Sequence, residues 1–521
     1  MRATGSDCAK GPGARGCVEW RKLTRQEGIA IAITLALLSV VGVWHLPPGA
    51  CFDDAGDLQV ACATLGIAHP PGYAGYTTVG WLLCKAFFFI EPAYVVSLAC
   101  LGCMVTSLGV LAVLLVRLGL HVLAACSLTL ILVAHHTPWQ SSVWQSMVCP
   151  EVYAPSWALL VGTTYFLFKY GRLHRRRDLC VAAGLFGFLM VNRPPSALFG
   201  FGLVIGWLLI EGRRCSSVTD LFKRAGAALA SAALPILIVL VLLWFRDTPS
   251  TAYNIIEQHS QVYGGLPDQT EGFDGRYRRL SWLVTAEVFQ HLVIADLSHA
   301  PQKLRWIRRV LFVYDTGPFV GLCVVLLIGA WRLIRQGGEW MSCAVGVVLG
   351  NVAFLGLYNV HAQAANLLPL MFGIALLTGA VLSTVMPTHA GERSRSMAAT
   401  LFILVSIWTV YHSATRYNYG DAYDATGFLD QVDLATLPRD AVICTVTQKA
   451  CPLWYARIVT HWRPDVQIFA AVPHRWNELV QSALHRPVFY TNEHAAVPAG
   501  WRLVPDRNLW RLKPTLVDET S

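Results

Sequence analysis

The sequence predicts an all-α polytopic membrane bundle followed by a small C-terminal α/β domain. Of its 521 residues, 55% are hydrophobic and only 14% are charged, with a mean hydropathy of +0.47, whereas soluble globular proteins carry about 25% charged residues. Long apolar stretches recur along the chain, and basic residues gather in the short loops between them. This composition excludes a soluble enzyme of this length. The net charge is +9, but the basic residues are spread over the loops between the apolar stretches, as in membrane proteins. We therefore expect no nucleic-acid partner.

About eleven apolar stretches are candidate transmembrane helices, the shorter of which require tilt or have inexact boundaries. They are residues 28–46, 95–116, 119–136, 153–170, 179–192, 196–211, 225–245, 310–331, 340–358, 367–386 and 398–413. The basic clusters all fall on one side if the N-terminus is cytoplasmic and the apolar run 74–90 is a re-entrant or interfacial hairpin. We therefore expect an integral multi-pass protein, in a bacterial inner membrane, with an extracytoplasmic C-terminus.

The chain divides into three predicted parts: a basic cytoplasmic N-terminus at 1–27, a transmembrane domain at 28–413 and a soluble extracytoplasmic domain at 414–521. The first external loop is 47–94. The loop 246–309 alternates polar and apolar positions, which suits one or two amphipathic helices lying on the membrane.

The C-terminal domain contains short apolar runs that predict buried strands. The strands are expected at 441–446, 466–472 and 486–491, with a helix around 452–461. Its few acids form no recognisable pair, so we expect this domain to aid acceptor binding or stability and to carry no catalytic group.

Ionisable residues crowd the first external loop, just after the first span. Asp53, Asp54 and Asp57 come first, and His69 begins the sequence His-Pro-Pro-Gly-Tyr that ends at Tyr73. A charged side chain costs several kcal/mol inside hydrocarbon, so these carboxylates are either ordinary solvated loop residues or a site at the membrane surface. The neighbouring glycines and prolines form a rigid turn, which favours a site.

Two other external segments carry polar residues at the mouth of a span. The run 139–145 ends in Gln145 and is followed by Glu151 and Tyr153, while Asn192 and Arg193 end another span. An interfacial aromatic belt explains the tryptophans of the first segment equally well, and Arg193 could simply extend to the membrane surface. A site for a lipid phosphate explains all of these residues together, because arginine matches phosphate oxygens and a nearby carboxylate can accept a proton from a hydroxyl.

These residues carry a resemblance to a known family. The stretches 52–58, 64–73 and 144–153 are similar to the multi-span family that includes the eukaryotic protein O-mannosyltransferase acting on plexin-type receptor domains. The likeness extends more loosely to the tail, from Leu437 to Val466. The resemblance implies a C-type glycosyltransferase (GT-C) fold, whose first external loop holds the catalytic carboxylate and whose donor is a polyprenyl-phosphate-linked sugar.

The resemblance also implies roles for individual residues. The family's two acids fall on Asp54, the candidate general base, and on Asp57, where relatives usually have Glu. Asp57 and Glu151 are candidate catalytic residues that orient or bind sugar and acceptor. The candidate substrate-binding residues are Asp53, His69, Tyr73, Gln145, Tyr153, Asn192 and Arg193, with His69 and Arg193 assigned to the lipid phosphate.

The chain departs from the family pattern in two places. Residues 447–450 are not acidic where relatives commonly are, and the external segment 358–369 offers His361, Gln363 and Asn366 in place of an expected acid. We therefore allow the acceptor or the accessory functions of this protein to differ from those of the family.

The resulting prediction is a membrane glycosyltransferase that moves a sugar, with mannose as one option, to an acceptor hydroxyl on the non-cytoplasmic face by an inverting displacement. No cofactor or metal is required, although carboxylates beside a phosphate could bind Mg²⁺ or Mn²⁺. The expected partners are the polyprenyl-phosphate-sugar donor, a protein or glycan acceptor, and the lipid bilayer.

Two other classes stay open. A transporter or flippase of lipid-linked glycans predicts internal repeats and ionisable residues at the bilayer midplane, neither of which the sequence shows. A non-catalytic assembly protein that uses its tail to bind a partner is distinguished from an enzyme only by mutation with an activity readout.

Overall fold

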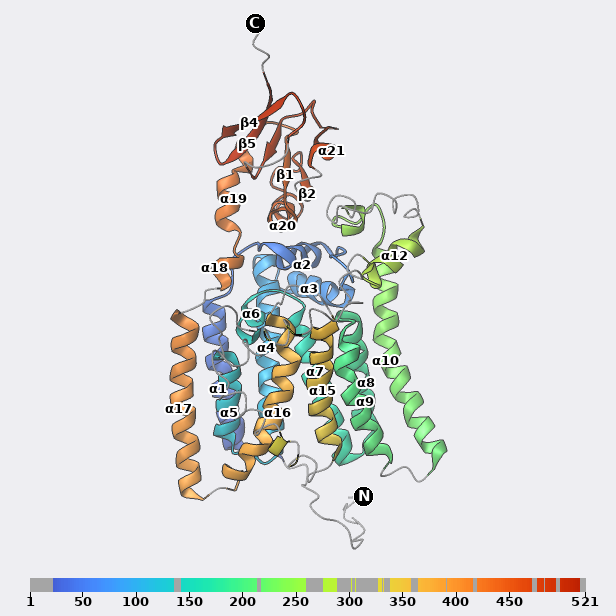
Figure 1. Ribbon diagram of the computed structural model, residues 1–521, viewed down its shortest axis with the longest axis vertical. Coiled ribbons are helices and arrows are strands. Elements are labelled where there is room, and N and C mark those ends of the chain that lie inside the picture. The colour runs from blue at the N-terminus through green and yellow to red at the C-terminus, as the bar shows by residue number, and fades with distance from the viewer. Residues whose placement is uncertain are drawn as a thin grey trace, which may run out of the picture.

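The computed structural model describes residues 22–134, 142–212, 217–258, 275–287, 301, 305, 327–329, 331, 338–357, 364–389, 391–415, 419–470, 476–481, 483–492 and 497–515. Within these residues, a bundle of long helices carries two transverse helices and a C-terminal sheet at one end (Figure 1). The bundle consists of α1 (Arg25–Trp44), α4 (Pro92–Arg117), α5 (Val122–Ala134), α7 (Tyr153–Leu173), α8 (Arg176–Asn192), α9 (Ser196–Gly212), α10 (Val218–Arg246), α15 (Gly338–Leu357), α16 (Leu368–Val385) and α17 (Glu392–Thr415).

The apolar stretches predicted as spans coincide with these helices, except that 310–331 lies almost entirely outside the described residues. Among the described residues, five helices are long and apolar enough to cross a membrane. They are Arg25–Trp44, Pro92–Arg117, Val218–Arg246, Ala365–Val385 and Glu392–Tyr411. The mostly helical architecture and the small sheet are confirmed, and the total of eleven spans stays a prediction.

Small residues bring the bundle helices close together. An added Cβ at Gly187 of α8 would lie 2.0 Å from the carbonyl oxygen of Ala232 in α10, so only glycine allows this approach. The outer face of α10 is apolar and exposed, for example at Leu234 and Leu237. In a membrane, lipid covers such a face.

Two short helices, α2 (Asp53–Thr64) and α3 (Ala74–Ala86), lie across one end of the bundle (Figure 1). The acidic segment is therefore helical, which corrects our expectation that it forms part of a rigid turn. The helix forms because its apolar and small residues, from Ala55 to Cys62, are buried against neighbouring elements. Helix α3 is about 20 Å long, too short to cross about 30 Å of hydrocarbon. A turn follows it, so the run 74–90 is a single transverse helix instead of a hairpin.

Several short elements complete the region between the bundle and the tail. They are α6 (Ser142–Val148), η1 (Ile255–Gln258), α12 (Arg276–Val284), η5 (Ala364–Leu367), α18 (Tyr419–Tyr423), α19 (Thr426–Val432) and η6 (Leu434–Thr436). Helix α12 buries Trp282 and Leu283, as expected of an amphipathic helix in the loop 246–309. Much of that loop lies outside the described residues.

The C-terminal domain is a five-stranded sheet of order β2-β1-β3-β5-β4. Its strands are β1 (Val442–Thr445), β2 (Gln467–Ala470), β3 (Val488–Tyr490), β4 (Trp501–Asp506) and β5 (Leu509–Pro514). Strand β1 is fully buried, as its continuous apolar sequence predicts. It pairs in parallel with β2 and β3. The antiparallel hairpin β4–β5 was not predicted, because its strands are only half-buried and mix charged with apolar residues.

The predicted tail helix begins earlier than expected. It comprises α20 (Thr447–Trp454) and a π-helical turn η7 (Tyr455–Val459). The helix α21 (Trp476–Gln481) lies beyond β2 and was not predicted. Helix α20 and η7 pack against α2, and this contact places the tail directly on the acidic helix.

Candidate functional site

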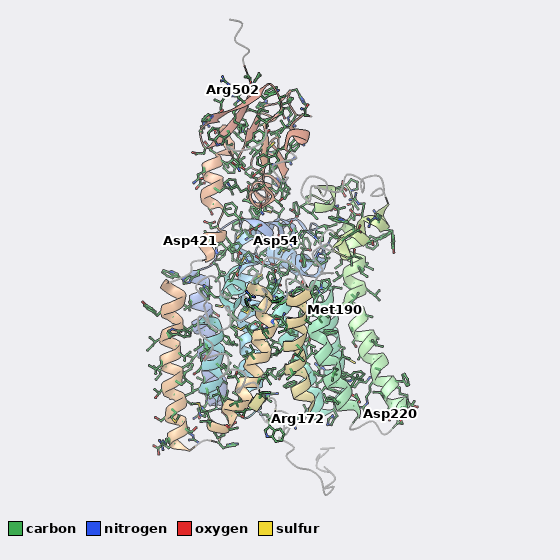
Figure 2. All side chains as sticks on the ribbon, in the orientation of Figure 1. Asp54, Arg172, Met190, Asp220, Asp421 and Arg502 are labelled. Atoms are coloured by element: carbon green, nitrogen blue, oxygen red, sulfur yellow. The ribbon has the colours of Figure 1, made fainter. Side chains whose placement is uncertain are left out.

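The candidate site lies where the bundle, the transverse helices and the tail meet. Asp54 lies at this junction, and Arg172, from one of the basic clusters, lies at the opposite end of the bundle (Figure 2). This separation agrees with the predicted topology. Which end faces the cytoplasm stays a prediction.

The three carboxylates of helix α2 differ in their exposure to solvent. Asp53, the first helical residue, has a φ of +58°, in the left-handed region that Asp tolerates better than most residues. Asp53 and Asp54 are exposed, and 56% of the Asp54 side chain is accessible. Asp57 lies one turn further on, where the helix faces the protein interior, and only 6% of its side chain is accessible.

Asp57 accepts three hydrogen bonds, which together engage both of its oxygens. Its Oδ2 atom accepts from the backbone N–H of His69 at 2.9 Å and from His69 Nδ1 at 2.5 Å. Its Oδ1 atom accepts from the hydroxyl of Tyr253, which is also buried. These hydrogen bonds hold the carboxylate in place, and the carboxylate in turn orients His69 and Tyr253.

His69 lies between Asp57 and Asp54. Its Nε2 atom is 3.8 Å from Asp54 Oδ2, and the imidazole forms a T-shaped contact with the ring of Tyr73 at a centroid distance of 5.1 Å. Burial lowers the pKa of His69, but the charge of Asp54 and the hydrogen bond to Asp57 outweigh burial and raise that pKa to about 9. His69 is therefore an imidazolium at neutral pH.

Glu151 is buried in the turn that precedes α7. Burial, followed by the charge of Asp54, raises its pKa to about 8. Its Oε1 atom accepts a hydrogen bond from Cys149 Sγ at 3.4 Å. Glu151 is thus mostly protonated at neutral pH and can donate a hydrogen bond, which an ionised carboxylate cannot do.

Arg193 belongs to a second group of candidate residues. Its guanidinium donates to Asn366 Oδ1 and lies over the rings of Tyr153 and Phe354, at 5.1 and 5.5 Å from their centroids. The neighbouring Asn192 donates to Ser156 Oγ at 2.7 Å. A pocket beside Arg193 is lined by Tyr153, Ser156, Trp157, Leu160, Leu189, Ser196, Leu368 and Pro369.

Gln145 contacts the beginning of the tail. Its Nε2 atom donates to the hydroxyl of Tyr423 at 2.9 Å. The backbone N–H of Phe52 donates to the carbonyl of Tyr423 at 3.0 Å, and Cys51 forms a β-bridge with Asp424. The residues before α2 are therefore held by the segment that leads into the C-terminal domain.

The structure brings together Asp54, Asp57, His69 and Tyr73. Glu151 lies near enough for the charges of Asp54 and His69 to shift its pKa. Tyr153, Asn192 and Arg193 form the separate group around the pocket, and Asp53 and Gln145 lie at the edge of the acidic group. The acidic motif and His-Pro-Pro-Gly-Tyr marked these residues, whereas nothing local in the sequence marks Tyr253 or Tyr423 as contacts of the site.

In the described part of the chain, no three His, Cys, Asp or Glu side chains lie close enough together to hold a metal ion. Binding of Mg²⁺ or Mn²⁺ beside a bound phosphate stays a prediction.

No family model matches the chain. A stretch of 231 residues is 27% identical to protein O-mannosyl-transferase TMEM260 of Mus musculus. The matched region is 43% of this chain and 31% of the mouse protein, so the chain aligns with about a third of its relative's length.

Proposed function

We propose that the protein is a GT-C glycosyltransferase that moves a sugar from a polyprenyl-phosphate-linked donor to a hydroxyl of a protein or glycan acceptor. The reaction takes place on the non-cytoplasmic face of a bacterial inner membrane, at the end of the bundle that carries α2. We propose mannose as the sugar, by analogy with the mouse relative's name.

The observation that supports this proposal is that the three carboxylates differ in exposure, in hydrogen bonding and, for Glu151, in a raised pKa. Asp54 is accessible to an acceptor, Asp57 is buried with hydrogen bonds to both of its oxygens, and Glu151 is buried with a raised pKa. Asp54 is therefore the general base. It takes the proton of the acceptor hydroxyl while that oxygen attacks the anomeric carbon and the bond to the phosphate oxygen breaks, with inversion.

His69 and Arg193 have orienting and binding roles, respectively. His69, held by Asp57, presents its Nε2–H toward Asp54 and fixes the position of the base. We therefore favour this role over the phosphate-binding role expected from the sequence. Arg193 is the proposed ligand of the phosphate, because aromatic rings and Asn366 hold its guanidinium and its planar fork suits phosphate oxygens. In this scheme the chain's own residues supply the base and the phosphate ligand, and no organic cofactor is needed.

The test replaces Asp54 by Asn, which has nearly the same shape but cannot accept a proton at neutral pH. Transfer from radiolabelled polyprenyl-phosphate mannose is measured in membranes with matched expression, and we expect turnover to fall by about 10²–10⁴-fold. Asp53→Asn is the matched control, since Asn also tolerates the left-handed backbone at this position, and it should retain most of the transfer. Normal turnover by Asp54→Asn would refute the base assignment.

A further inference from the structure

The segment that follows α10 is fixed against the loop leading to His69. Ile67 N donates to Tyr253 O at 2.9 Å, and Ile255 N donates to Ile67 O at 3.1 Å. An added Cβ at Gly66 would lie 2.5 Å from Tyr253 O, so the two backbones touch. Tyr253 therefore has a defined place beside the site before its side chain is considered.

The side chain of Tyr253 completes the hydrogen bonding of Asp57. It is 1% exposed, and its hydroxyl donates to Asp57 Oδ1 while His69 occupies Oδ2. With both oxygens engaged, the carboxylate has one preferred orientation. That orientation sets the direction of the imidazole and hence the 3.8 Å separation between His69 Nε2 and Asp54 Oδ2.

The ring of Tyr253 rests on the C-terminal domain. It lies 5.8 Å, centroid to centroid, from the ring of Trp454, which is 1% exposed and ends α20. The next residue, Tyr455, donates to Glu91 and accepts from Ala93 N at 3.1 Å, so the end of α20 is anchored to the start of α4.

We propose that Tyr253 is a positioning residue for the Asp57–His69 pair and that Trp454 holds it in place, so that the C-terminal domain forms part of the active site. This inference rests on the proposed function. It replaces the expectation that the tail serves only acceptor binding or stability, because a chain of direct contacts leads from α20 to the residue beside the general base.

The experiment compares Tyr253→Phe and Trp454→Ala in the full-length protein, again with polyprenyl-phosphate mannose as donor. Tyr253→Phe removes one hydroxyl and keeps the ring, and Trp454→Ala removes the support of that ring. Since a misplacement of about 1 Å at an active site can cost about 10²-fold, we expect kcat to fall about 10-fold and about 10–100-fold, respectively. The KM for the donor should stay within about twofold of the wild-type value. Trp454→Phe, which retains an aromatic ring, should restore most of the kcat lost in Trp454→Ala.

Trp476→Ala is the matched control. Trp476 is also a fully buried tryptophan of the C-terminal domain, but it packs on Tyr490 in the core of the sheet, away from Tyr253. We expect this variant to lower the stability of the domain and to leave kcat near the wild-type value. An equal loss of kcat in Trp476→Ala and Trp454→Ala would overturn the proposal, because general damage to the domain would then explain both.

A second measurement separates this proposal from the proposed function. A double-mutant cycle of Tyr253→Phe and Asp57→Asn, followed by thermal unfolding of the purified protein, tests the contact without any substrate. Non-additive effects support the contact, and additive effects overturn it. If the wild-type protein fails to use polyprenyl-phosphate mannose, the proposed function fails while the cycle still decides the contact.

Discussion

Gly56 lies where the acidic helix touches the C-terminal domain, and replacing it with alanine tests that contact directly. A Cβ at this position would lie 2.0 Å from the carbonyl oxygen of Cys51 and 2.8 Å from the Cβ of Cys451 in α20. Real Cβ contacts almost never fall below 3.0 Å. The variant therefore forces the backbone of Cys51, or α2 relative to α20, to move by about 1 Å.

The expected magnitude follows from two opposing effects. Alanine in a helix is favoured over glycine by about 1 kcal/mol, whereas overpacking a tight contact costs about 1–3 kcal/mol and more where backbone has to move. We expect a net loss of about 1–2 kcal/mol in the free energy of unfolding. Turnover should fall by about 10²-fold, because the same displacement moves Asp54 and Asp57.

The assay is thermal unfolding of the purified protein in detergent, followed by tryptophan fluorescence, together with sugar transfer in membranes. Gly102→Ala in α4 is the control, since a Cβ there meets nothing within 4 Å and should be neutral or slightly stabilising. If Gly56→Ala unfolds at the same temperature as Gly102→Ala and retains full transfer, the close packing of α2 on α20 is wrong.

Two further predictions concern protonation. Because burial raises the pKa of Glu151 to about 8, Glu151→Gln should transfer sugar at pH 6.5 nearly as well as the wild type, and a 10²-fold loss at that pH would contradict a neutral Glu151. The pKa of His69 is raised from 6.5 to about 9, so His69 stabilises the fold fully below pH 6.5 and loses this effect as the pH rises through about 9. We expect the unfolding temperature to fall between pH 6.5 and 9.5, and to fall less in His69→Gln; equal slopes for the two proteins would show that His69 is not responsible.

The sequence alone determined the class of this protein and most of its helices. The apolar stretches around α4, α10 and α16 have the length and composition of membrane helices, because the hydrocarbon interior imposes both. The continuous apolar run of β1 predicted a buried strand, because a strand buried on both faces is apolar at successive positions. The acidic motif and His-Pro-Pro-Gly-Tyr also marked the residues that meet at Asp57.

Only the tertiary structure decided the state of those residues. Asp57 receives its third hydrogen bond from Tyr253, which lies 196 positions along the chain. The protonation of Glu151 depends on burial and on the charge of Asp54, which hydropathy along the chain does not reveal. The contact of Trp454 with Tyr253 joins the tail to the site. Local sequence patterns record whether a residue is buried in its own helix or strand, whereas hydrogen bonds and pKa values depend on which distant segments pack together.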